Sequence, residues 1–285
     1  MGLLSELKLA VPWGHIAVKA WGSQKNPPVL CLHGWLDNAN SFDRLIPLLS
    51  QDYYYVAMDF GGHGLSSHYN PGLPYYHQNF VSEVRRVATA FKWTRFSLLG
   101  HSFGGTVGGM ETENILTYKR RNIEHTLQVE ASQKSPRVLS PEEMLQGFLS
   151  NNSHVKKECG ELLLQRGATK VATGLVLNRD RRISLPENSF EFMSRELFVH
   201  STRSLQANVL LIKAMSGYYD VRRTNDDNKE PVVFMVDTLK TILRERFQFV
   251  EVPGNHYVHL NEPHLVAGAI NSFLQSQSRM THSRL

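Results

Sequence analysis

The sequence contains few cysteines, no long apolar run and no strong excess of charge of one sign. Its 285 residues include only two cysteines, Cys31 and Cys159, whose separation along the chain excludes a disulfide framework and suits a reducing compartment. No apolar run approaches the roughly 18 residues of a membrane span, and the N-terminus lacks the basic and apolar regions of a secretory signal. We therefore expect a soluble globular protein with no membrane span.

Charge and histidine patterns argue against two further classes of function. The net charge of +5 is mild, and the basic runs at 119–121, 179–182 and 222–223 are scattered among acidic residues. We interpret these runs as solvated surfaces, because a nucleic-acid-binding stripe would be denser. The thirteen histidines are dispersed and form no H-E-x-x-H or other metal-ligand spacing. The sequence predicts neither a nucleic-acid partner nor a metal site.

The C-terminal end resembles a targeting signal. The chain is polar from Gln275 onward and finishes with Ser283, Arg284 and Leu285, a variant of the Ser-Lys-Leu peroxisomal address in which one cation replaces another. A three-residue match can also arise by chance. We expect these three residues to bind a peroxisomal import receptor, which places the protein in the peroxisome, the cytoplasm or both.

The rest of the chain is organised around a short strand that runs into a serine. Phe96–Leu99 is apolar, and Gly100–Gly104 reads G-x-S-x-G with Ser102 at its centre. This pattern is typical of a nucleophile elbow, in which the serine projects from a sharp turn beside a base. Glycines flank the serine because a side chain there would crowd the turn. A merely structural turn is the alternative.

Strand and helix patterns alternate along the chain. Apolar and polar residues alternate over 3–21, which predicts a β-hairpin. The continuous apolar or alternating runs of five later strands lie at 29–32, 53–58, 96–99, 208–214 and 247–252. Helices are predicted at 40–49, capped by Asn40 or Ser41, at 76–91 and at 262–273. This order predicts an α/β fold with a parallel sheet covered on both faces.

Three motifs in order give the chain a family resemblance. His33-Gly34-Trp35 follows one strand, D-x-x-G-H-G-x-S at Asp59–Ser66 follows the next, and the elbow at Gly100–Gly104 follows the third. This signature resembles that of the α/β-hydrolase fold and, among its members, the serine hydrolase-like proteins. The resemblance is tight over 5–110 and good over 205–275. It implies a mostly parallel central sheet flanked by helices, with residues 1–110 and 206–285 as the core and 111–205 as a helical cap.

The resemblance also implies roles for individual residues. Ser102 would be the nucleophile, and the backbone N–H groups of Phe103 and Trp35 would form the oxyanion hole. We expect Asp59 and His63 to shape a loop without taking part in chemistry. His33 is interpreted as an orienting or core histidine rather than a base.

The base and the acid are expected later in the chain, in the order Ser, Asp, His. His256 follows the strand at 247–252 and a glycine, where the family places its base, and His259 is a rival. Asp220 follows the strand at 208–214 and would orient His256. Asp220 could instead open an exposed loop, and the family can take its acid from an earlier strand.

The pattern breaks after the elbow. A helix of about eleven residues and a short loop should bring the next buried strand near 118–125, but Thr117 to His125 contains no apolar run. We infer that on the order of twenty or more residues are absent relative to the family, including most of the nucleophile helix and one interior strand. A degenerate strand is the alternative, and the charges at 119–121 disfavour it.

The intervening cap is helical by pattern, with helices predicted at 141–149, 159–165, 168–177 and 191–200.

The sequence as a whole predicts a serine hydrolase that cleaves a small-molecule ester or thioester through an acyl-Ser102 intermediate, without a cofactor. A catalytically silent homologue with at most a binding role is the alternative. Cofactor-free lyase or oxygenase chemistry on the same fold is a third, weaker one.

Overall fold

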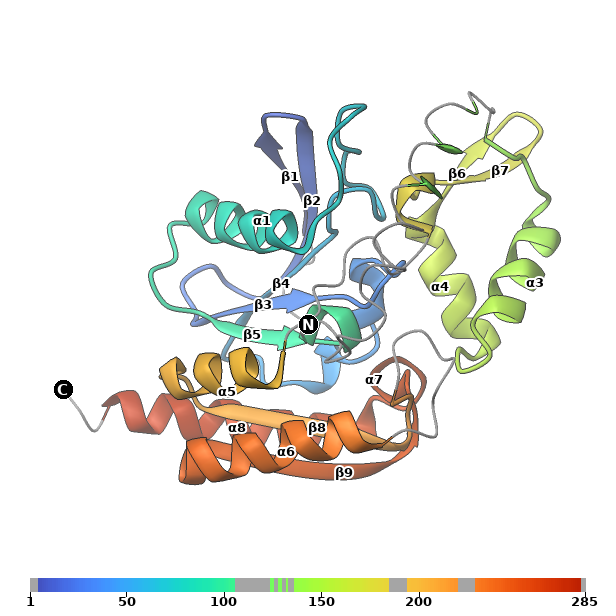
Figure 1. Ribbon diagram of the computed structural model, residues 1–285. Coiled ribbons are helices and arrows are strands. Elements are labelled where there is room, and N and C mark those ends of the chain that lie inside the picture. Colours follow the sequence, from blue (N-terminus) through green and yellow to red (C-terminus); the bar gives the residue numbers. More distant parts are fainter. Residues whose placement is uncertain are drawn as a thin grey trace.

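The computed structural model describes residues 5–105, 124–125, 128–129, 132, 136–184, 194–219 and 229–282, with side chains up to Gln277. Its strands form a five-stranded sheet, a parallel pair and a small hairpin (Figure 1). The strands are β1 (Ser5–Val11), β2 (Gly14–Trp21), β3 (Pro28–Leu32), β4 (Tyr54–Met58), β5 (Ser97–Gly100), β6 (Ala168–Val171), β7 (Gly174–Leu177), β8 (Val209–Ser216) and β9 (Phe247–Asn255).

The five-stranded sheet has the order β1-β2-β4-β3-β5. Strands β3, β4 and β5 run parallel, with Leu30 opposite both Val56 and Leu98, and β1 and β2 form the predicted antiparallel hairpin. Strands β8 and β9 pair in parallel with each other. The five later strands predicted from apolar runs are therefore confirmed, within one to three residues at their ends.

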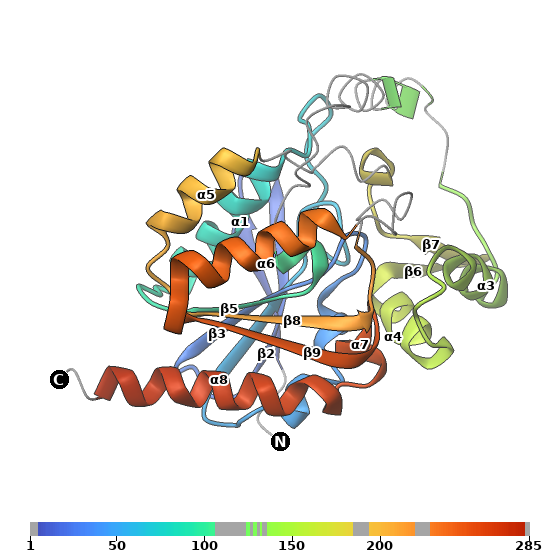
Figure 2. The same cartoon turned by 60° about the horizontal axis from the view of Figure 1, so that its bottom comes forward.

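Helices cover both faces of the sheet (Figure 2). The helices of the described residues, including those of the flank, are η1 (Ala39–Phe42), η2 (Ile46–Leu48), α1 (His77–Ala90), η3 (Ser102–Gly105), α3 (Pro141–Asn151), α4 (Lys157–Gly167), η4 (Arg181–Ser184), α5 (Arg195–Ser204), α6 (Glu230–Leu243), η6 (Arg244–Arg246), α7 (Val258–Asn261) and α8 (His264–His282). Alternate residues of β3 point to opposite faces: Cys31 packs in the cluster that includes Ile270 of α8, and Leu30 packs in the cluster that includes Phe80 of α1. This double burial explains the continuous apolar run of β3.

Two predicted helices are wrong. The segment 40–49 forms the short 3₁₀ turns η1 and η2, and the side chain of Asn38 caps η1 by accepting the N–H of Asn40. Pro47 removes one backbone donor there, which disfavours a continuous α-helix. The segment 168–177 forms the hairpin β6–β7, because Gly174 adopts φ 152° at its turn and a Cβ there would lie 2.4 Å from the Leu139 carbonyl oxygen. Helix α6 was not predicted.

Strand β5 is unusually exposed for a strand that carries a nucleophile motif. It pairs with β3, β8 pairs with β9, and among the described residues no strand joins β5 to β8. Leu98, on one side of β5, is 60% exposed. Most of the segment in which the sequence predicts a lost helix and strand, 106–123, lies outside the described residues, so that loss stays a prediction.

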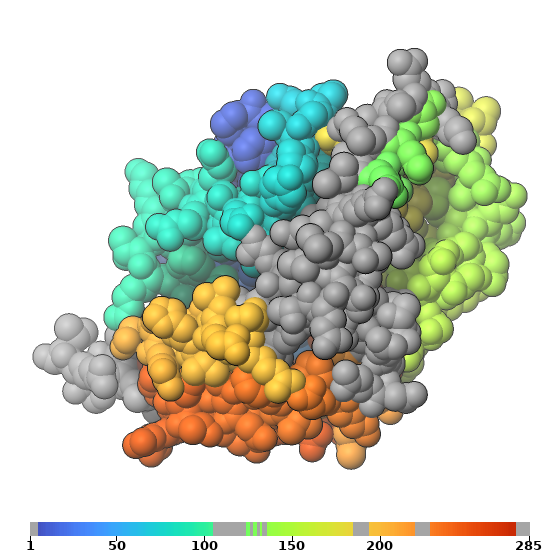
Figure 3. Space-filling model, viewed as in Figure 1, coloured from blue at the N-terminus to red at the C-terminus, as the bar shows by residue number. Residues whose placement is uncertain are grey.

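Residues 136–184, here called the cap segment, contain α3, α4 and the β6–β7 hairpin and form the right-hand flank of the molecule in Figure 3. Cys159 and Leu163 of α4 pack with Tyr257 and Leu260 of the core. Helix α5 lies in the predicted cap range of 111–205, but it packs on α6 of the core through Phe198.

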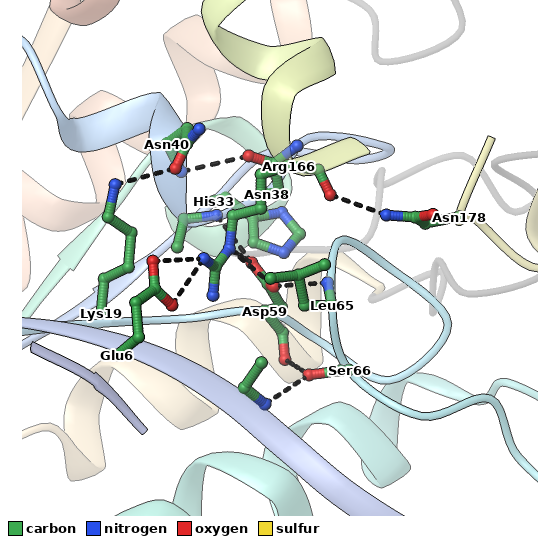
Figure 4. Close-up of polar contacts among 12 residues, drawn as sticks. Glu6, Lys19, His33, Asn38, Asn40, Asp59, Leu65, Ser66, Arg166 and Asn178 are labelled. Carbon is green, nitrogen blue, oxygen red and sulfur yellow. Dashed lines mark hydrogen bonds and ion pairs between the residues drawn. The ribbon is translucent and has the colours of Figure 1, made fainter. Parts of the chain in front are cut away.

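One buried ion pair joins the cap segment to the core (Figure 4). The Asp59 carboxylate is fully buried and accepts hydrogen bonds from Arg166 Nε of α4 at 2.8 and 3.0 Å. The same carboxylate accepts the N–H groups of Ala39 at 2.8 Å and Leu65 at 2.7 Å. Arg166 Nη1 also donates to both carboxylate oxygens of Glu6 on β1 at 2.8 Å. A single carboxylate therefore fixes the loops after β3 and β4 and the end of α4.

A second buried carboxylate lies between α1 and the loop after β4. Glu83 of α1 accepts the Gly61 N–H at 2.9 Å and the Tyr69 hydroxyl at 2.5 Å. Burial raises the pKa of Glu83 to about 7, against the opposing effect of these two hydrogen bonds. The group is therefore partly protonated near neutral pH.

Arg166→Met is expected to lower the free energy of unfolding by about 3–5 kcal/mol, because it leaves the Asp59 carboxylate buried without its cation. Urea unfolding measures the loss. Lys156→Met is the matched control: Lys156 pairs with Glu262 at 3.6 Å between the cap segment and the core, but both side chains are exposed. Its removal should cost at most about 1 kcal/mol. Equal losses of unfolding free energy in the two variants would contradict the idea that Arg166 stabilises the fold by pairing with the buried Asp59 carboxylate.

Glu83→Gln is expected to flatten the pH dependence of stability. The pKa of Glu83 rises from an ordinary value of 4.5 to about 7 on folding, so its contribution is fully present below pH 4.5 and is lost as the pH rises through 7. Glutamine keeps an acceptor and a donor without titrating. As the pH rises from 4 to 8, the free energy of unfolding of the variant should increase by up to about 3 kcal/mol relative to that of the wild type.

Urea unfolding at several pH values checks the gain. Glu142→Gln, at an exposed position in the first turn of α3, serves as the control and should show no such change. A constant difference between Glu83→Gln and the wild type across this range would show that Glu83 does not titrate on folding.

Candidate functional site

Ser102 sits at a strained turn between β5 and η3. Its φ is 50°, in the left-handed region that side chains other than glycine rarely adopt. The turn lies tight against β3: the His101 N–H donates to the Leu32 carbonyl oxygen at 3.0 Å, and a Cβ on Gly104 would lie 2.1 Å from that same oxygen. Gly104 is therefore required for this close approach, as expected for a nucleophile elbow.

His256 meets Ser102 from the end of β9. Gly254 adopts φ 114° in the last residues of the strand, and the chain then turns at His256. The Nε2 atom of His256 lies 2.9 Å from Ser102 Oγ, within hydrogen-bond distance. The two residues are 154 positions apart in the sequence, so the fold, not local structure, brings them together.

The rival histidine has a different partner. His259 Nε2 lies 2.8 Å from the hydroxyl of Ser41, and the ring is buried. Burial holds the pKa of His259 well below its usual value, and the charges of His101 and His256 lower it further. His259 is therefore a neutral residue of the interior.

The predicted acid, Asp220, lies outside the described residues, and its role stays a prediction. Tyr218, two residues before Asp220, lies beside His256, and the centroids of the two rings are 4.9 Å apart. The Tyr218 ring also stacks on His154 of the cap segment, at 4.0 Å and an interplanar angle of 5°. The segment that leads to Asp220 is thus next to His256.

The two predicted oxyanion residues are neighbours at the elbow. Trp35 follows β3, Phe103 follows Ser102, and their ring centroids are 5.1 Å apart in an edge-to-face arrangement. Both rings also contact Phe80 of α1. The use of their backbone N–H groups as oxyanion donors stays a prediction.

His33 is fully buried behind this site. Its Nδ1 atom lies 2.6 Å from the Gly34 carbonyl oxygen, and its Nε2 atom accepts the N–H of Phe60 at 3.1 Å. Because a carbonyl can only accept, Nδ1 carries the proton. Burial lowers the pKa of His33 and keeps the ring neutral. These contacts join the loops after β3 and β4, which fits the predicted orienting role.

The cap segment contributes a residue that the sequence did not reveal. The carbonyl oxygen of His154 accepts the side-chain amides of Asn255 at 2.8 Å and Asn261 at 2.6 Å, on either side of His256. No motif marks His154 or these asparagines, because their contacts link segments about a hundred residues apart. The loop between α3 and α4 is thus tied to the loop that holds His256.

The described residues contain no group of three or more histidine, cysteine, aspartate or glutamate side chains that could hold a metal ion. In the same part of the chain, no helix is both long and apolar enough to cross a membrane.

Comparisons with known proteins agree with this fold. Residues 27–110 match the family model described as the alpha/beta hydrolase fold. The serine hydrolase-like protein of Mus musculus is 72% identical and is aligned over 100% of both chains. Serine hydrolase-like protein 2 of Homo sapiens is 65% identical over 96% of this chain and 95% of the relative.

The mouse alignment is longer than this chain. It runs over 311 positions and covers all 285 residues, an excess of 26 positions at which the mouse protein has residues and this chain has none. This difference agrees in size with the predicted absence of on the order of twenty or more residues relative to the family.

Solved structures share the architecture. A hypothetical protein from Pseudomonas aeruginosa is 27% identical, with a TM-score of 0.78 over 95% of this chain and 99% of that one. A thioesterase domain from the curacin biosynthetic pathway has a TM-score of 0.75 at 20% identity over 96% of this chain and 99% of its own, which bears on the fold alone. With the relatives that match over its whole length, these findings place the chain in the family of serine hydrolase-like proteins, which have the α/β-hydrolase fold.

Proposed function

We propose that this chain cleaves a carboxylic ester or thioester of a small molecule through an acyl-Ser102 intermediate. The hydrogen-bond distance of 2.9 Å between Ser102 Oγ and His256 Nε2 is the observation that carries the proposal. A serine hydroxyl is a weak nucleophile unless a positioned base accepts its proton, and His256 is placed to do so. The membership of the family supports the same reaction class.

The proposed reaction has two stages. As Ser102 Oγ forms a bond to the acyl carbon, its proton moves to His256 Nε2, and a tetrahedral oxyanion forms. Collapse of that intermediate breaks the bond to the leaving alcohol or thiol, which takes the proton from His256. A water molecule then attacks the acyl-serine, with His256 again accepting and returning a proton, and the carboxylic acid is released.

Two further roles complete the proposal. The backbone N–H groups of Phe103 and Trp35 would stabilise the oxyanion, each contributing about 10²–10³ in rate. Asp220 would hold the His256 ring in the correct tautomer and stabilise the imidazolium. The position of Tyr218 against His256, two residues before Asp220, supports this assignment.

The second candidate is a catalytically silent homologue with at most a binding role. The 60% exposure of Leu98 and the 26 extra positions in the mouse alignment favour it, because both fit a core that has lost a covering element. A strand edge without its neighbour leaves backbone groups to be satisfied by water or another partner.

We further propose that Ser283, Arg284 and Leu285 bind a peroxisomal import receptor and that the protein is located in the peroxisome, the cytoplasm or both. The match of these three residues to the Ser-Lys-Leu address supports this proposal.

Ser102→Ala is expected to abolish covalent labelling by a fluorophosphonate, because the probe reacts with an activated serine. Gel fluorescence of the purified protein measures the labelling, with Ser150→Ala, at an exposed position on α3, as the matched control that keeps it. His256→Ala should slow labelling strongly, since it removes the base. Labelling that persists in Ser102→Ala would place the nucleophile elsewhere.

A thermal melt recorded beside the labelling separates the two candidates. A cooperative melt with labelling at Ser102 supports the hydrolase. A cooperative melt without labelling of the wild type supports the silent homologue.

Deletion of residues 283–285 is expected to abolish peroxisomal import of the chain fused at its N-terminus to a fluorescent protein, because the receptor would read these three residues as the targeting address. Arg284→Lys, which restores the Ser-Lys-Leu address, is the control and should still be imported. Unchanged localisation after the deletion would refute the signal.

A further inference from the structure

The residue between the first glycine and the serine of the G-x-S-x-G motif, His101, contacts the proposed base. His101 Nε2 lies 2.9 Å from the carbonyl oxygen of His256. A carbonyl oxygen only accepts hydrogen bonds, so Nε2 carries a proton and donates it. The residue before the nucleophile thus holds the backbone of the residue that would activate it.

The other nitrogen of His101 faces a buried carboxylate. His101 Nδ1 lies 3.6 Å from Asp37 Oδ2, and the side chains are only 11% and 3% exposed. Among the residues that the structure describes, neither of these two atoms has a hydrogen-bond partner. A Cβ on Gly34 would lie 2.8 Å from each of them, so the glycine of the His33-Gly34-Trp35 motif allows the two side chains to approach.

Because Nε2 of His101 carries a proton, the charge of the ring decides whether the contact between Nδ1 and the Asp37 carboxylate is attractive or repulsive. A neutral ring with its proton on Nε2 would turn the lone pair of Nδ1 toward the Asp37 carboxylate, which is unfavourable in a buried place. A ring with protons on both nitrogens makes the same approach attractive. The arrangement therefore favours an imidazolium at His101 beside a carboxylate at Asp37.

Four more titratable groups lie around this pair, and one of them is the buried, neutral His33, which interacts electrostatically with Asp37. The ring of His259 lies 3.9 Å from that of His101, and the rings of His256 and Tyr257 lie at 5.1 and 5.2 Å. The Tyr257 hydroxyl is 3.3 Å from Asp37 Oδ1. His259 is held by Ser41 and is neutral, so it adds no charge beside His101.

We propose that Asp37 and His101 form a positioning pair for His256, in which Asp37 holds a protonated His101 and His101 holds the carbonyl group of His256. The pair connects the loop after β3, the elbow and the end of β9. Its effect on rate rests on the proposed function, whereas the protonation of His101 rests on the geometry alone.

Fluorophosphonate labelling tests the effect on rate. His101→Leu removes the donor and should slow labelling of Ser102 by about 10–100-fold, the cost expected when a reacting group moves by about 1 Å. His101→Gln keeps an N–H at the position of Nε2 and should keep most of the rate. His200→Leu, at an exposed position on α5, is the matched control, and thermal melts confirm that each variant is folded.

The pH profile of labelling distinguishes the proposed role from a merely structural one, because a merely structural role of His101 would not change the pH midpoint of labelling. His101→Gln removes a positive charge 5.1 Å from the His256 ring but leaves the Asp37 carboxylate. His256 then binds its proton more readily, and the pH midpoint of labelling should rise. A folded His101→Leu variant with the wild-type rate and midpoint would overturn the proposal.

Histidine NMR tests the pair without any activity. In protein labelled with ¹⁵N-histidine, we expect His101 to carry protons on both ring nitrogens at neutral pH and to lose the Nδ1 proton in Asp37→Asn. A His101 ring that carries a proton on only one nitrogen at neutral pH would overturn the proposal. If the wild type is not labelled by the fluorophosphonate, the proposed function fails, and the NMR result still decides whether the Asp37–His101 pair exists.

Discussion

The buried carboxylate of Asp59 is the constraint on which the site depends. It accepts two backbone N–H groups from the loops after β3 and β4 and both hydrogen bonds from Arg166 Nε. A charge without exposure to water must be fully paired, so these groups cannot move independently. The cap segment is therefore held to the loop after β3, which contains His33 and Trp35, and to the loop after β4 (Figure 4). The D-x-x-G-H-G-x-S motif is in this sense a structural motif that serves the neighbouring chemistry.

Parallel strands bring the reactive residues together. Strands β3 and β5 end side by side, and β9 ends at His256, so the loops with Trp35, Ser102 and His256 meet at one edge of the molecule. The strained φ of Ser102 is maintained by the close contact of Gly104 with β3. Packing of buried strands thus supplies the energy that keeps the serine in its projecting conformation.

Local sequence patterns were enough to predict strands β1 to β5, β8 and β9 and helices α1 and α8, and the motifs marked the candidate site residues. Ser102 and His256 were marked because each follows a strand and a glycine, and the fold brings Ser102 Oγ and His256 Nε2 to 2.9 Å from each other. The patterns failed at 168–177, where residues of mixed propensity form a hairpin on Gly174, and at 40–49, where a buried Asn38 cap and Pro47 favour 3₁₀ turns. His154 and the Asp37–His101 contact could not be predicted, because their partners lie on distant segments and are chosen by tertiary packing.

The described contacts that hold the Ser102–His256 pair come from elements other than a helix following Ser102. His256 is fixed by the carbonyl contact with His101, by the asparagines that hold His154, and by the ring of Tyr218. Ser102 is fixed by the contact of its turn with β3. None of these contacts uses the exposed side of β5 near Leu98. The geometry of the Ser102–His256 pair therefore does not depend on a strand packed against the Leu98 side of β5.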